Sequence, residues 1–571
     1  MHPIPEQIDV LVCGAGPAGL LTALGLEQQG INTLVIDKRA RDEQEATGRA
    51  TTLFPRSLEL LDQLGLTDDI TQECFIARSD ATFNNGVRST ERGWHEVFAS
   101  MRGTYHDYCV NIRQRYSEEI FGAKYATLSS TPILYGWGLV GFELEKLEGD
   151  DDNITAILAN SSSGQEARVR CKYLVGADGG NSTVRRLAGI TMEGDETTMK
   201  WIRLDGKFET DLPDANLGFA AIETKTHGNV LWVRLDKDAH RVGISLPAKL
   251  QEKYRAGITQ EQAVAEAVQA MQPFKLDVQR VDWWTLYSIK QKVAVTLQQN
   301  DFILLVGDAA HTHSSGFAQG MNTAIHDATN LIWKLSGTLK GWYSPSTVLP
   351  SYATERHAAA RKLISIDVAA SAAISGAIPD GYGPADSDPD DVLARVVADN
   401  TNFTLGAGVQ YGPSCINRLA NTTSVSLGNR APDALVRRPG IRLPRRLQEI
   451  ALVNGPGKWF VLVFGGWHLA TRDRVNALRE EINTGGLGKT PREMLNMATL
   501  FVGVAANAWD ALGGPAIGRL YFDHDGDAHS KYCISLDDGA IVVIRPDGVF
   551  GFAARLHELA KVKDYFEGFC L

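Results

Sequence analysis

The segment Val306-Gly307-Asp308-Ala309-Ala310-His311 decides the fold, because it closes an apolar run and has two counterparts elsewhere in the chain. The counterparts are Gly14-Ala15-Gly16-Pro17-Ala18-Gly19 and Gly176-Ala177-Asp178-Gly179, and each of them also follows a strand-like apolar run. Glycine-rich turns at the ends of parallel strands bind the phosphates and sugars of dinucleotides. Three such turns predict one extended site for a pyrophosphate and a ribityl chain, which points to FAD.

The first turn has the arrangement expected around a bound pyrophosphate. It lies between the β-branched run Ile8 to Cys13 and a segment of helical spacing up to Gly30, and the apolar run Ile31 to Ile36 follows. Glycines let the backbone approach a phosphate, and Asp37 is placed to accept a hydrogen bond from a ribose 2′-hydroxyl. The alternative is a tight turn beside a surface acid, which leaves the position of Asp37 at a strand end unexplained.

Asp308 follows the apolar strand Phe302 to Val306 and precedes two alanines. A carboxylate there can bind a sugar-like hydroxyl while the next helix points its N-terminus at the cofactor. A helix N-cap is the alternative role for this aspartate. His311 and His313 suggest a metal site, but the sequence offers no third ligand at suitable spacing, so we expect no metal.

The composition is that of a soluble globular protein with several domains. The 571 residues are 44% hydrophobic and 22% charged, and a chain of this length favours two to four domains. The formal charge of −11, without a dense Lys/Arg segment, argues against a nucleic-acid partner. Seven cysteines without a CxxC pattern, a polar N-terminus and apolar runs of only strand length predict a cytoplasmic protein without an integral membrane segment.

Hydrophobic periodicity divides the chain further. Alternation of polar and apolar residues at 77–108 and 200–287 predicts an antiparallel sheet with one covered face. The pattern over Tyr352 to Ile378 predicts a long helix. Beyond residue 428 an α/β unit is expected, including a hairpin of strands 532–536 and 540–544.

Further motifs make the resemblance to a known family specific. Gly48-Arg49-Ala50 and Gln114-Arg115-Tyr116-Ser117-Glu118 lie between the first two turns, and the tail runs from Gly428-Asn429-Arg430-Ala431-Pro432-Asp433 to Arg545-Pro546-Asp547-Gly548. In this order the motifs resemble those of class A flavin-dependent aromatic hydroxylases. The tail is similar to the thioredoxin-like domain of the phenol hydroxylase branch, so the resemblance covers nearly the whole chain.

The resemblance implies an α/β and α+β multidomain fold. Its parts are a Rossmann-like FAD-binding domain, an antiparallel-sheet substrate domain and a C-terminal thioredoxin-like domain. The expected boundaries are 1–76, 109–199 and 288–400 for the FAD-binding domain, 77–108 and 200–287 for the substrate domain, 401–427 for a linker and 428–571 for the thioredoxin-like domain. Gly465-Gly466-Trp467-His468 stands where a thioredoxin carries its cysteines, so no dithiol chemistry is expected.

The same resemblance implies a set of cofactor contacts. The first turn would hold the pyrophosphate, the end of the second strand the adenosine ribose, and the third turn and the following helix the ribityl chain and the flavin. The second turn is linked in the family to both FAD and the nicotinamide donor. The residues concerned are Gly14, Gly16, Pro17, Ala18, Gly19, Asp37, Lys38, Arg49, Gln114, Asp178, Arg185, Asp308, Gly320, Met321 and Asn322.

Departures from the family pattern bear on the substrate. The family loop after the histidines usually contains a proline, whereas this chain has Ser315-Gly316-Phe317-Ala318, and Thr51 stands where phenol hydroxylases carry an acid. Ser315, Phe317 and Thr51 are therefore expected in a reshaped substrate pocket. Tyr287 matches a family tyrosine that faces the substrate hydroxyl, and a core aromatic is its alternative role. Arg203 and Arg234, on the expected substrate sheet, are candidates to bind a phenolate or carboxylate, or are surface arginines.

The resemblance implies an FAD-dependent monooxygenase that inserts one oxygen atom into a phenolic ring through a flavin C4a-hydroperoxide, with NADPH or NADH and O2 as co-substrates. The same chemistry gives decarboxylative hydroxylation, dearomatisation, epoxidation or Baeyer–Villiger insertion in related cases, and the sequence does not separate these outcomes. A redox-silent scaffold with the same fold is the alternative from another class, and the intact turns argue against it. The small aromatic substrate and the reductant stay open, and the family suggests a homodimer.

Overall fold

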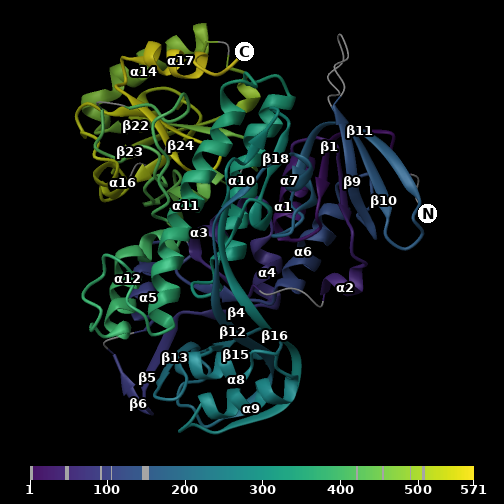
Figure 1. Ribbon diagram of the computed structural model, residues 1–571. Helices are drawn as coiled ribbons and strands as arrows, with labels where there is room; N and C mark the ends of the chain where they lie inside the picture. The colour runs from purple at the N-terminus through teal and green to yellow at the C-terminus, as the bar shows by residue number, and fades with distance from the viewer. Residues whose placement is uncertain are drawn as a thin grey trace.

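The computed structural model describes residues 4–45, 50–90, 93–104, 106–144, 154–419, 422–452, 455–488, 490–503 and 508–571. Figure 1 shows three regions: a mixed sheet with helices near the N-terminus, a second sheet at the bottom of the view, and a C-terminal α/β region in green and yellow at the upper left. The long helices α10 (Gln319–Leu339) and α11 (Val348–Ile374) lie between the first and the third region. The expected multidomain architecture of mixed α/β type is confirmed.

The first region is built on a sheet whose central strands are parallel. The order β17-β18-β11-β1-β2-β8 places β11 between β1 and β18, and both neighbours run parallel to it. The three glycine-containing turns follow β1, β11 and β18, so they meet at one edge of the sheet as expected. Its members are β1 (Gln7–Cys13), β2 (Thr33–Asp37), β8 (Leu134–Tyr135), β11 (Glu166–Gly176), β17 (Gln298–Gln299), β18 (Ile303–Leu305), and the antiparallel β9 (Trp137–Leu144) and β10 (Ile154–Asn160).

Helix α1 (Pro17–Gln28) packs between this sheet and helices α6 (Gln114–Ala126) and α10. All its residues from Ala18 to Leu26 are buried, so the helix is apolar on every side rather than amphipathic. Gly25 makes the close approach to α10 possible, because a Cβ at this position would lie 2.3 Å from the Ile332 side chain.

The second sheet has the order β19-β16-β12-β15-β14-β13-β5-β6. It is antiparallel, as expected, except that β5 pairs with β13 in parallel. One face packs on helices α8 (Ala248–Lys253) and α9 (Gln260–Ala270) in an apolar core. The strands are β5 (Ser79–Asn84), β6 (Val87–Ser89), β12 (Met192–Thr210), β13 (Gly218–Thr224), β14 (Gly228–Arg234), β15 (His240–Ser245), β16 (Leu276–Ala294) and β19 (His311–Thr312).

Strands β12 and β16 have 19 residues each and reach from the first region into the second, as Figure 1 shows. The expected domain boundaries at 199/200 and 287/288 fall inside these two strands. The chain therefore passes from the first region into the second within two strands that are hydrogen-bonded to each other. The expected linker at 401 also begins inside a helix, α12 (Pro389–Thr404).

Shorter elements complete the first two regions. A small three-stranded sheet has the order β3-β7-β4 and lies next to the first turns of α10. These elements are α2 (Arg41–Glu45), β3 (Thr52–Leu53), α3 (Pro55–Gln63), α4 (Thr67–Glu73), β4 (Phe75–Ala77), α5 (His95–Ser100), η1 (Met101–Gly103), β7 (Cys109–Asn111), α7 (Thr183–Leu187) and η2 (Gly307–Ala309).

The C-terminal region contains a five-stranded sheet of order β24-β23-β22-β25-β26, in which the first three strands are parallel and the last two antiparallel. The expected thioredoxin-like assignment stays a prediction. The elements are β20 (Leu435–Val436), β21 (Arg445–Arg446), α13 (Leu447–Leu452), β22 (Trp459–Gly466), α14 (His468–Gly485), η3 (Arg492–Met494), β23 (Leu495–Val502), α15 (Ala508–Leu512), β24 (Arg519–Asp523), α16 (Asp527–Lys531), β25 (Ala540–Ile544), β26 (Phe550–Ala554) and α17 (Leu559–Glu567).

The hairpin expected at 532–536 and 540–544 is wrong. Strand β25 is present, but the preceding segment is a turn after α16, and the true partner of β25 is β26. The turn that joins β25 to β26 is Arg545-Pro546-Asp547-Gly548, a sequence with proline and glycine at favoured turn positions. In the described part of the chain, no helix combines the length and the apolar character that a bilayer crossing requires.

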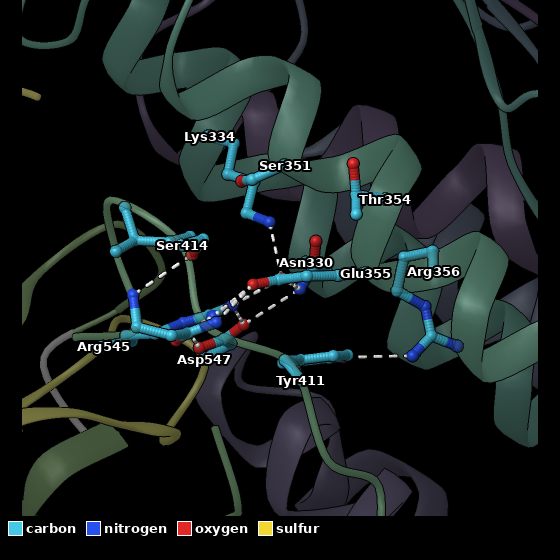
Figure 2. Close-up of polar contacts among 12 residues, drawn as sticks. Asn330, Lys334, Ser351, Thr354, Glu355, Arg356, Tyr411, Ser414, Arg545 and Asp547 are labelled. Atoms are coloured by element: carbon cyan, nitrogen blue, oxygen red, sulfur yellow. Dashed lines mark hydrogen bonds and ion pairs between the residues drawn. The ribbon is translucent and has the colours of Figure 1, made fainter. Parts of the chain in front are cut away.

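Arg545 in this turn is the centre of a buried network between the C-terminal region and helices α10 and α11, as Figure 2 shows. Its guanidinium donates to Glu355 Oε1 and Oε2 at 2.6 and 3.0 Å and to Asp547 Oδ1 and Oδ2 at 3.0 and 2.6 Å. A fifth bond of 2.8 Å goes to Asn417 Oδ1. The five N–H donors of an arginine are therefore all used.

Burial and ion pairing have opposite effects on the pKa values of Glu355 and Lys334 in this network. Burial raises the pKa of Glu355, but Arg545 and Lys334 outweigh it and hold that pKa well below its usual range. Lys334 donates to Glu355 Oε2 at 2.7 Å, and burial still lowers its pKa to about 8. The acid is thus held as a carboxylate, and its charge depends on the arginine from the C-terminal region.

A second contact fastens helix α3 to the same turn. Arg56 Nη1 donates to Glu59 Oε2 at 2.7 Å, and its other guanidinium nitrogen donates to the Asp547 carbonyl oxygen. Arg430 also donates to both oxygens of Glu59, at 2.9 and 2.5 Å. The pKa of Glu59, which burial raises, is lowered to about 2 by Arg430 and Arg56.

We predict that Arg545→Met lowers the free energy of unfolding by about 3–5 kcal/mol, because it leaves Glu355 and Asp547 buried without their cation. The matched control is Arg168→Met, which removes the exposed pair with Glu143 and costs about 0–1 kcal/mol. Urea unfolding followed by tryptophan fluorescence measures both changes. Equal losses in the two variants would contradict the assigned role of Arg545.

The lowered pKa of Glu355 predicts how the stability difference between wild type and Arg545→Met depends on pH. A carboxylate whose pKa is lower in the folded than in the unfolded state stabilises the protein above its unfolded pKa, and the contribution is lost as the pH falls. We therefore expect wild-type stability to fall from about pH 4.5 downward. The difference between wild type and Arg545→Met, measured from pH 7 to pH 4, should shrink towards the acid end.

Candidate flavin and substrate site

The turn after β1 requires glycine at two positions and leaves open space at a third. Gly14 has φ +113°, and a Cβ there would lie 2.2 Å from the Ala177 carbonyl oxygen. A Cβ at Gly19 would lie 1.9 Å from the carbonyl oxygen of Gly14. A Cβ at Gly16 would meet nothing nearer than Glu118 Oε1 at 3.9 Å, and no described side chain caps the helix that begins at Pro17. The open backbone and the uncapped helix N-terminus can accept a pyrophosphate.

Asp37 is buried at the end of β2 and accepts from the backbone N–H of Ala15 at 3.0 Å and of Arg39 at 2.9 Å. The carboxylate thus ties the pyrophosphate turn to the strand end where the ribose is expected. Lys38 is exposed beside it. Pro17 and Ala18 form the first turn of α1, with Pro17 at a position where the missing N–H costs no helical bond.

Gln114 starts α6 and is bound to the loop that precedes β3. Its Oε1 accepts from the Ala50 N–H at 3.2 Å, its backbone N–H donates to the Ala50 carbonyl oxygen at 2.9 Å, and its Nε2 donates to Glu118 Oε1 at 2.7 Å. Gln114 therefore anchors this loop at the first turn of α6. Arg49, the other expected phosphate contact, lies outside the described residues.

Asp178 binds the start of the helix that follows the second turn, and Arg185 joins the second turn to the third. Asp178 accepts from Ser182 Oγ at 2.5 Å and from the backbone N–H of Thr183 at 2.6 Å, at the start of helix α7. Arg185 donates to the carbonyl oxygens of Ala309 and Gly180 at 2.8 and 2.9 Å. In this structure the two side chains position the turns around the expected cofactor.

The buried side chain of Asp327 supports the third turn. Asp308 itself is exposed, in the short η2 turn. Asp327 Oδ2 accepts from the Gly307 N–H at 3.0 Å and bonds His311 Nε2 at 2.7 Å, while its Oδ1 accepts from Arg356 Nε at 2.6 Å. Burial raises the pKa of Asp327, but Arg356 and His311 lower it to about 2. His311 thus bonds a carboxylate that supports the turn.

His313 contacts its own chain, with Nδ1 2.8 Å from the Ser314 carbonyl oxygen. Among the described residues, no group of three or more His, Cys, Asp or Glu side chains has the arrangement of a metal site.

The N-terminus of α10 faces the same edge and is open. The residue before the helix, Ala318, has left-handed backbone with φ 54°, and no described side chain caps the helix. A Cβ added at Gly320 would meet nothing within 4 Å, and Met321 beside it is buried. Asn322 donates to the carbonyl oxygens of Thr52 and Ala318 at 2.8 and 2.7 Å and accepts from the Phe54 N–H at 2.9 Å. It therefore fixes β3 to the start of the helix.

The structure brings Arg203, Ser315 and Tyr287 together. Arg203 Nη2 donates to Ser315 Oγ at 3.0 Å, and the same serine hydroxyl bonds the Tyr287 hydroxyl. Arg203 lies on β12 and is 5% exposed, and burial lowers its pKa. Tyr287 lies on β16 opposite Trp201 of β12. A buried cation, a serine and a phenol therefore share one hydrogen-bonded group on the face of the second sheet that is not covered by α8 and α9.

A cavity adjoins this group. The second sheet lines one side of the cavity. The other side is lined by α12, the end of α11 and the loop at 316–317. Arg203 and Phe317 are among the residues that line it. The other lining residues are Gly93, Trp94, Trp201, Ala221, Glu223, Asn229, Val230, Leu231, Gly243, Ser245, Gly316, Ile374, Asp390, Leu393, Ala394 and Val397.

Thr51 and Arg234 are not among the residues that line this cavity. Thr51 is buried and its Oγ1 accepts from Arg241 Nη1 at 3.3 Å. Arg234 donates to Asn216 Oδ1 at 2.6 Å and lies 3.6 Å from Asp238, so the structure does not bring it to Arg203. Its role as a residue that holds the substrate stays a prediction, with a surface arginine as the alternative.

Sequence reasoning missed a buried ion pair on the same face. Arg241 Nε donates to Asp205 Oδ1 at 2.6 Å and its Nη2 to Asp205 Oδ2 at 2.8 Å. The two residues face each other across β12 and β15, two positions along from Arg203 and Gly243. The alternation of residues along each strand could have indicated which face of the sheet Arg241 and Asp205 occupy. The register that pairs the two strands cannot be read from the sequence.

Comparisons with known proteins bear on this site. Residues 7–367 match the family model described as FAD binding domain, and residues 505–571 match the model described as phenol hydroxylase, C-terminal dimerisation domain. The FAD-dependent monooxygenase ankC of Aspergillus thermomutatus is 28% identical over 98% of each chain. Phenol 2-monooxygenase fsqG of Aspergillus fumigatus is 27% identical over 100% of this chain and 97% of its own.

Among solved structures, the flavin-dependent monooxygenase PieE in complex with FAD and substrate aligns over 98% of each chain with a TM-score of 0.74. At 19% identity this likeness shows the fold. The first family match spans more than half of the chain, over the region that carries all three turns. The chain therefore belongs to the FAD binding domain family and is an FAD-dependent monooxygenase of the class A aromatic hydroxylase type.

Proposed function

We propose that the protein hydroxylates a phenolic aromatic substrate bound in the cavity beside Arg203. The observation that carries the proposal is the bonding of Ser315 to both Arg203 and Tyr287 at the edge of a cavity that apolar side chains largely line. A buried guanidinium stabilises a phenolate and lowers the pKa of a phenol bound next to it. A phenolate ring is electron-rich, which is what an electrophilic oxygen requires.

The cofactor contacts proposed for this reaction are the turns described above. The fit is supported by the open backbone at Gly16 and Gly320 and by the uncapped N-termini of α1 and α10. Gly14, Gly19 and Asp37 would shape the pyrophosphate and ribose end, and Asp308 would bind ribityl hydroxyls. When bound, FAD supplies electron transfer from NAD(P)H and activation of O2.

The chain's own residues have three tasks in this proposal. Arg203 holds the phenolate oxygen by charge, while Tyr287 and Ser315 hold it by hydrogen bonds and pass its proton on. Trp94, Phe317 and the apolar face of α12 keep water from the ring. The uncapped N–H groups at the start of α10, which follows the loop that contains Ser315, would hold the flavin.

We predict that Gly16→Val abolishes FAD binding while the fold is retained. The backbone at Gly16 has φ −77° and ψ −179°, which valine adopts, and the added side chain would point into the space proposed for the pyrophosphate. Gly103→Val is the matched control, because a Cβ at Gly103 meets nothing within 4 Å and the residue lies in η1, away from the turns. The FAD content from absorbance, read beside the thermal unfolding midpoint, tests both. A Gly16→Val protein that keeps its FAD refutes the assignment.

We predict that Tyr287→Phe and Arg203→Met each lower kcat/KM for phenol hydroxylation by about 100-fold or more. Arg203→Met should also move the alkaline rise of the pH profile of kcat/KM upward, because the substrate phenol loses the cation that favours its ionised form. Arg234→Met is the control and should leave the profile unchanged. Substrate-stimulated NAD(P)H oxidation together with product mass, a gain of one oxygen atom, gives the readout. Unchanged hydroxylation in both site variants would refute the assignment.

We also propose that the protein is a homodimer in solution. The match of residues 505–571 to a phenol hydroxylase dimerisation domain supports this proposal. Light scattering coupled to gel filtration should give twice the mass of 62.2 kDa per chain. A single-chain mass at micromolar concentration would contradict it.

A further inference from the structure

The loop that carries Ser315 is held by a buried aspartate on helix α11. Asp367 Oδ2 accepts from the backbone N–H of Ser314 at 2.8 Å, and its Oδ1 accepts from Ser314 Oγ at 2.5 Å. Both residues are buried, so these bonds form away from water, where they are stronger. One residue of the loop is therefore bound through both its backbone and its side chain.

Strand β16 is joined to the same carboxylate. Gln291 of β16 donates from Nε2 to Asp367 Oδ2 at 2.8 Å and to Ser371 Oγ, one turn further along α11, at 3.2 Å. Tyr287 lies four residues before Gln291 on this strand. Asp367 thus fixes the loop relative to the strand that carries Tyr287, although Ser314 and Asp367 are 53 positions apart in the chain.

The three groups that bind Asp367 are neutral donors: a backbone N–H, a serine hydroxyl and a side-chain amide. A buried carboxylate is costly to hold away from water unless its hydrogen bonds are made. A shift of the loop would leave a buried oxygen with too few donors. The carboxylate therefore favours one position of the loop.

The next residue, Ser315, is the one that bonds both Arg203 and Tyr287. On its other side the Gly316 N–H donates to Ser314 Oγ at 3.1 Å, so the hydroxyl bound to the aspartate also binds the residue after Ser315. This loop has no proline, and glycine restricts the backbone least. Hydrogen bonds rather than a proline ring therefore have to fix the position of Ser315.

We propose that Asp367 is a positioning residue for the reaction, although it does not line the cavity. It acts through the loop, and it determines where Ser315 stands between Arg203 and Tyr287. This inference rests on the proposed function, because these three side chains are the ones assigned there to the substrate hydroxyl. A misplacement of about 1 Å at a reacting group can cost about 100-fold in rate.

Loss of this positioning changes what happens to O2. In hydroxylation, two electrons come from NAD(P)H, one atom of O2 enters a C–H bond of the substrate as a hydroxyl group, and the other atom leaves as water with the hydride hydrogen and one proton. When the substrate is not oriented, the same hydride and proton reduce O2 to hydrogen peroxide. We expect the loss of the Asp367 contacts to shift the enzyme from the first reaction to the second.

Asp367→Ala removes all three bonds. Its matched control is Ser371→Ala, which removes only the bond from Gln291 to the next turn of α11. With phenol and 3-hydroxybenzoate as probes, Asp367→Ala should lower the hydroxylated product formed per NAD(P)H oxidised by about ten-fold or more, with hydrogen peroxide making up the difference. Ser371→Ala should keep the wild-type ratio.

Asp367→Asn separates hydrogen bonding from charge. Its amide oxygen can accept from the Ser314 N–H and from Gln291 Nε2, and its amide nitrogen can donate to Ser314 Oγ. We therefore expect this variant to keep most of the wild-type product per NAD(P)H oxidised. An asparagine variant that makes as much peroxide as the alanine variant would overturn the proposal that these bonds position the loop.

Hydrogen exchange followed by mass spectrometry reads the loop without turnover. The peptide over residues 312–319 should exchange about ten-fold faster in Asp367→Ala than in wild type or Ser371→Ala, because the Ser314 N–H loses its acceptor. Equal exchange overturns the proposal. Where Asp367→Ala does not fold, Ser314→Ala takes its place, since it removes both bonds of Ser314 Oγ. Unchanged exchange and an unchanged product ratio in that variant also overturn it.

The outcomes keep this proposal apart from the proposed function. If wild type and Asp367→Ala hydroxylate the probes with the same product per NAD(P)H oxidised, the role of Asp367 is refuted and the hydroxylase assignment stands. If the wild type hydroxylates neither probe, the proposed function fails, and the exchange experiment still decides whether Asp367 anchors the loop.

Discussion

The bidentate contact of Arg545 with Glu355 is the constraint on which the relative placement of the domains depends. Taking a guanidinium and two carboxylates out of water is costly, and the loss is recovered only when the hydrogen-bond geometry is complete. All five donors of Arg545 meet acceptors at 2.6–3.0 Å. Hydrophobic contacts between the regions tolerate small shifts, whereas this set of directional bonds admits one arrangement of the β25–β26 turn against α11.

Helix α10 connects the network around Arg545 to the proposed flavin site. Lys334 and Asn330 reach the buried network, Asp327 supports the third turn, and Asn322 fixes β3 near the start of the helix. These residues span 12 positions, or about 18 Å along one rigid helix. A displacement of the C-terminal region therefore moves the N–H groups proposed to face the flavin. Helix α10 thus links the C-terminal region to the proposed cofactor site.

The sequence predicted those parts of the molecule whose signal is local. The three glycine turns, the strands before them, the helix near residues 352–378 and strand β25 were all predictable, because each depends on periodicity or on a backbone that only glycine adopts. The continuous course of β12 and β16 from the first region into the second was not, because the length of a strand that spans two regions depends on its pairing partner rather than on a local signal. The partner of β25 was misassigned, since residues 532–536 have the pattern of a strand but follow α16 in a tight turn.

Within the site, the sequence indicated which residues to consider, but not which of them are hydrogen-bonded to each other. Arg203, Ser315 and Tyr287 were each singled out, but their common hydrogen bonds depend on the register of β12 against β16 and on a loop more than a hundred residues from Arg203. A one-residue slip of β12 would exchange Arg203 for the core residue Leu204 on the cavity face. The apolar core under α8 and α9 prevents that slip, because it would expose Ile202 and Leu204. The buried face of the sheet thus determines which charges the cavity presents to a substrate.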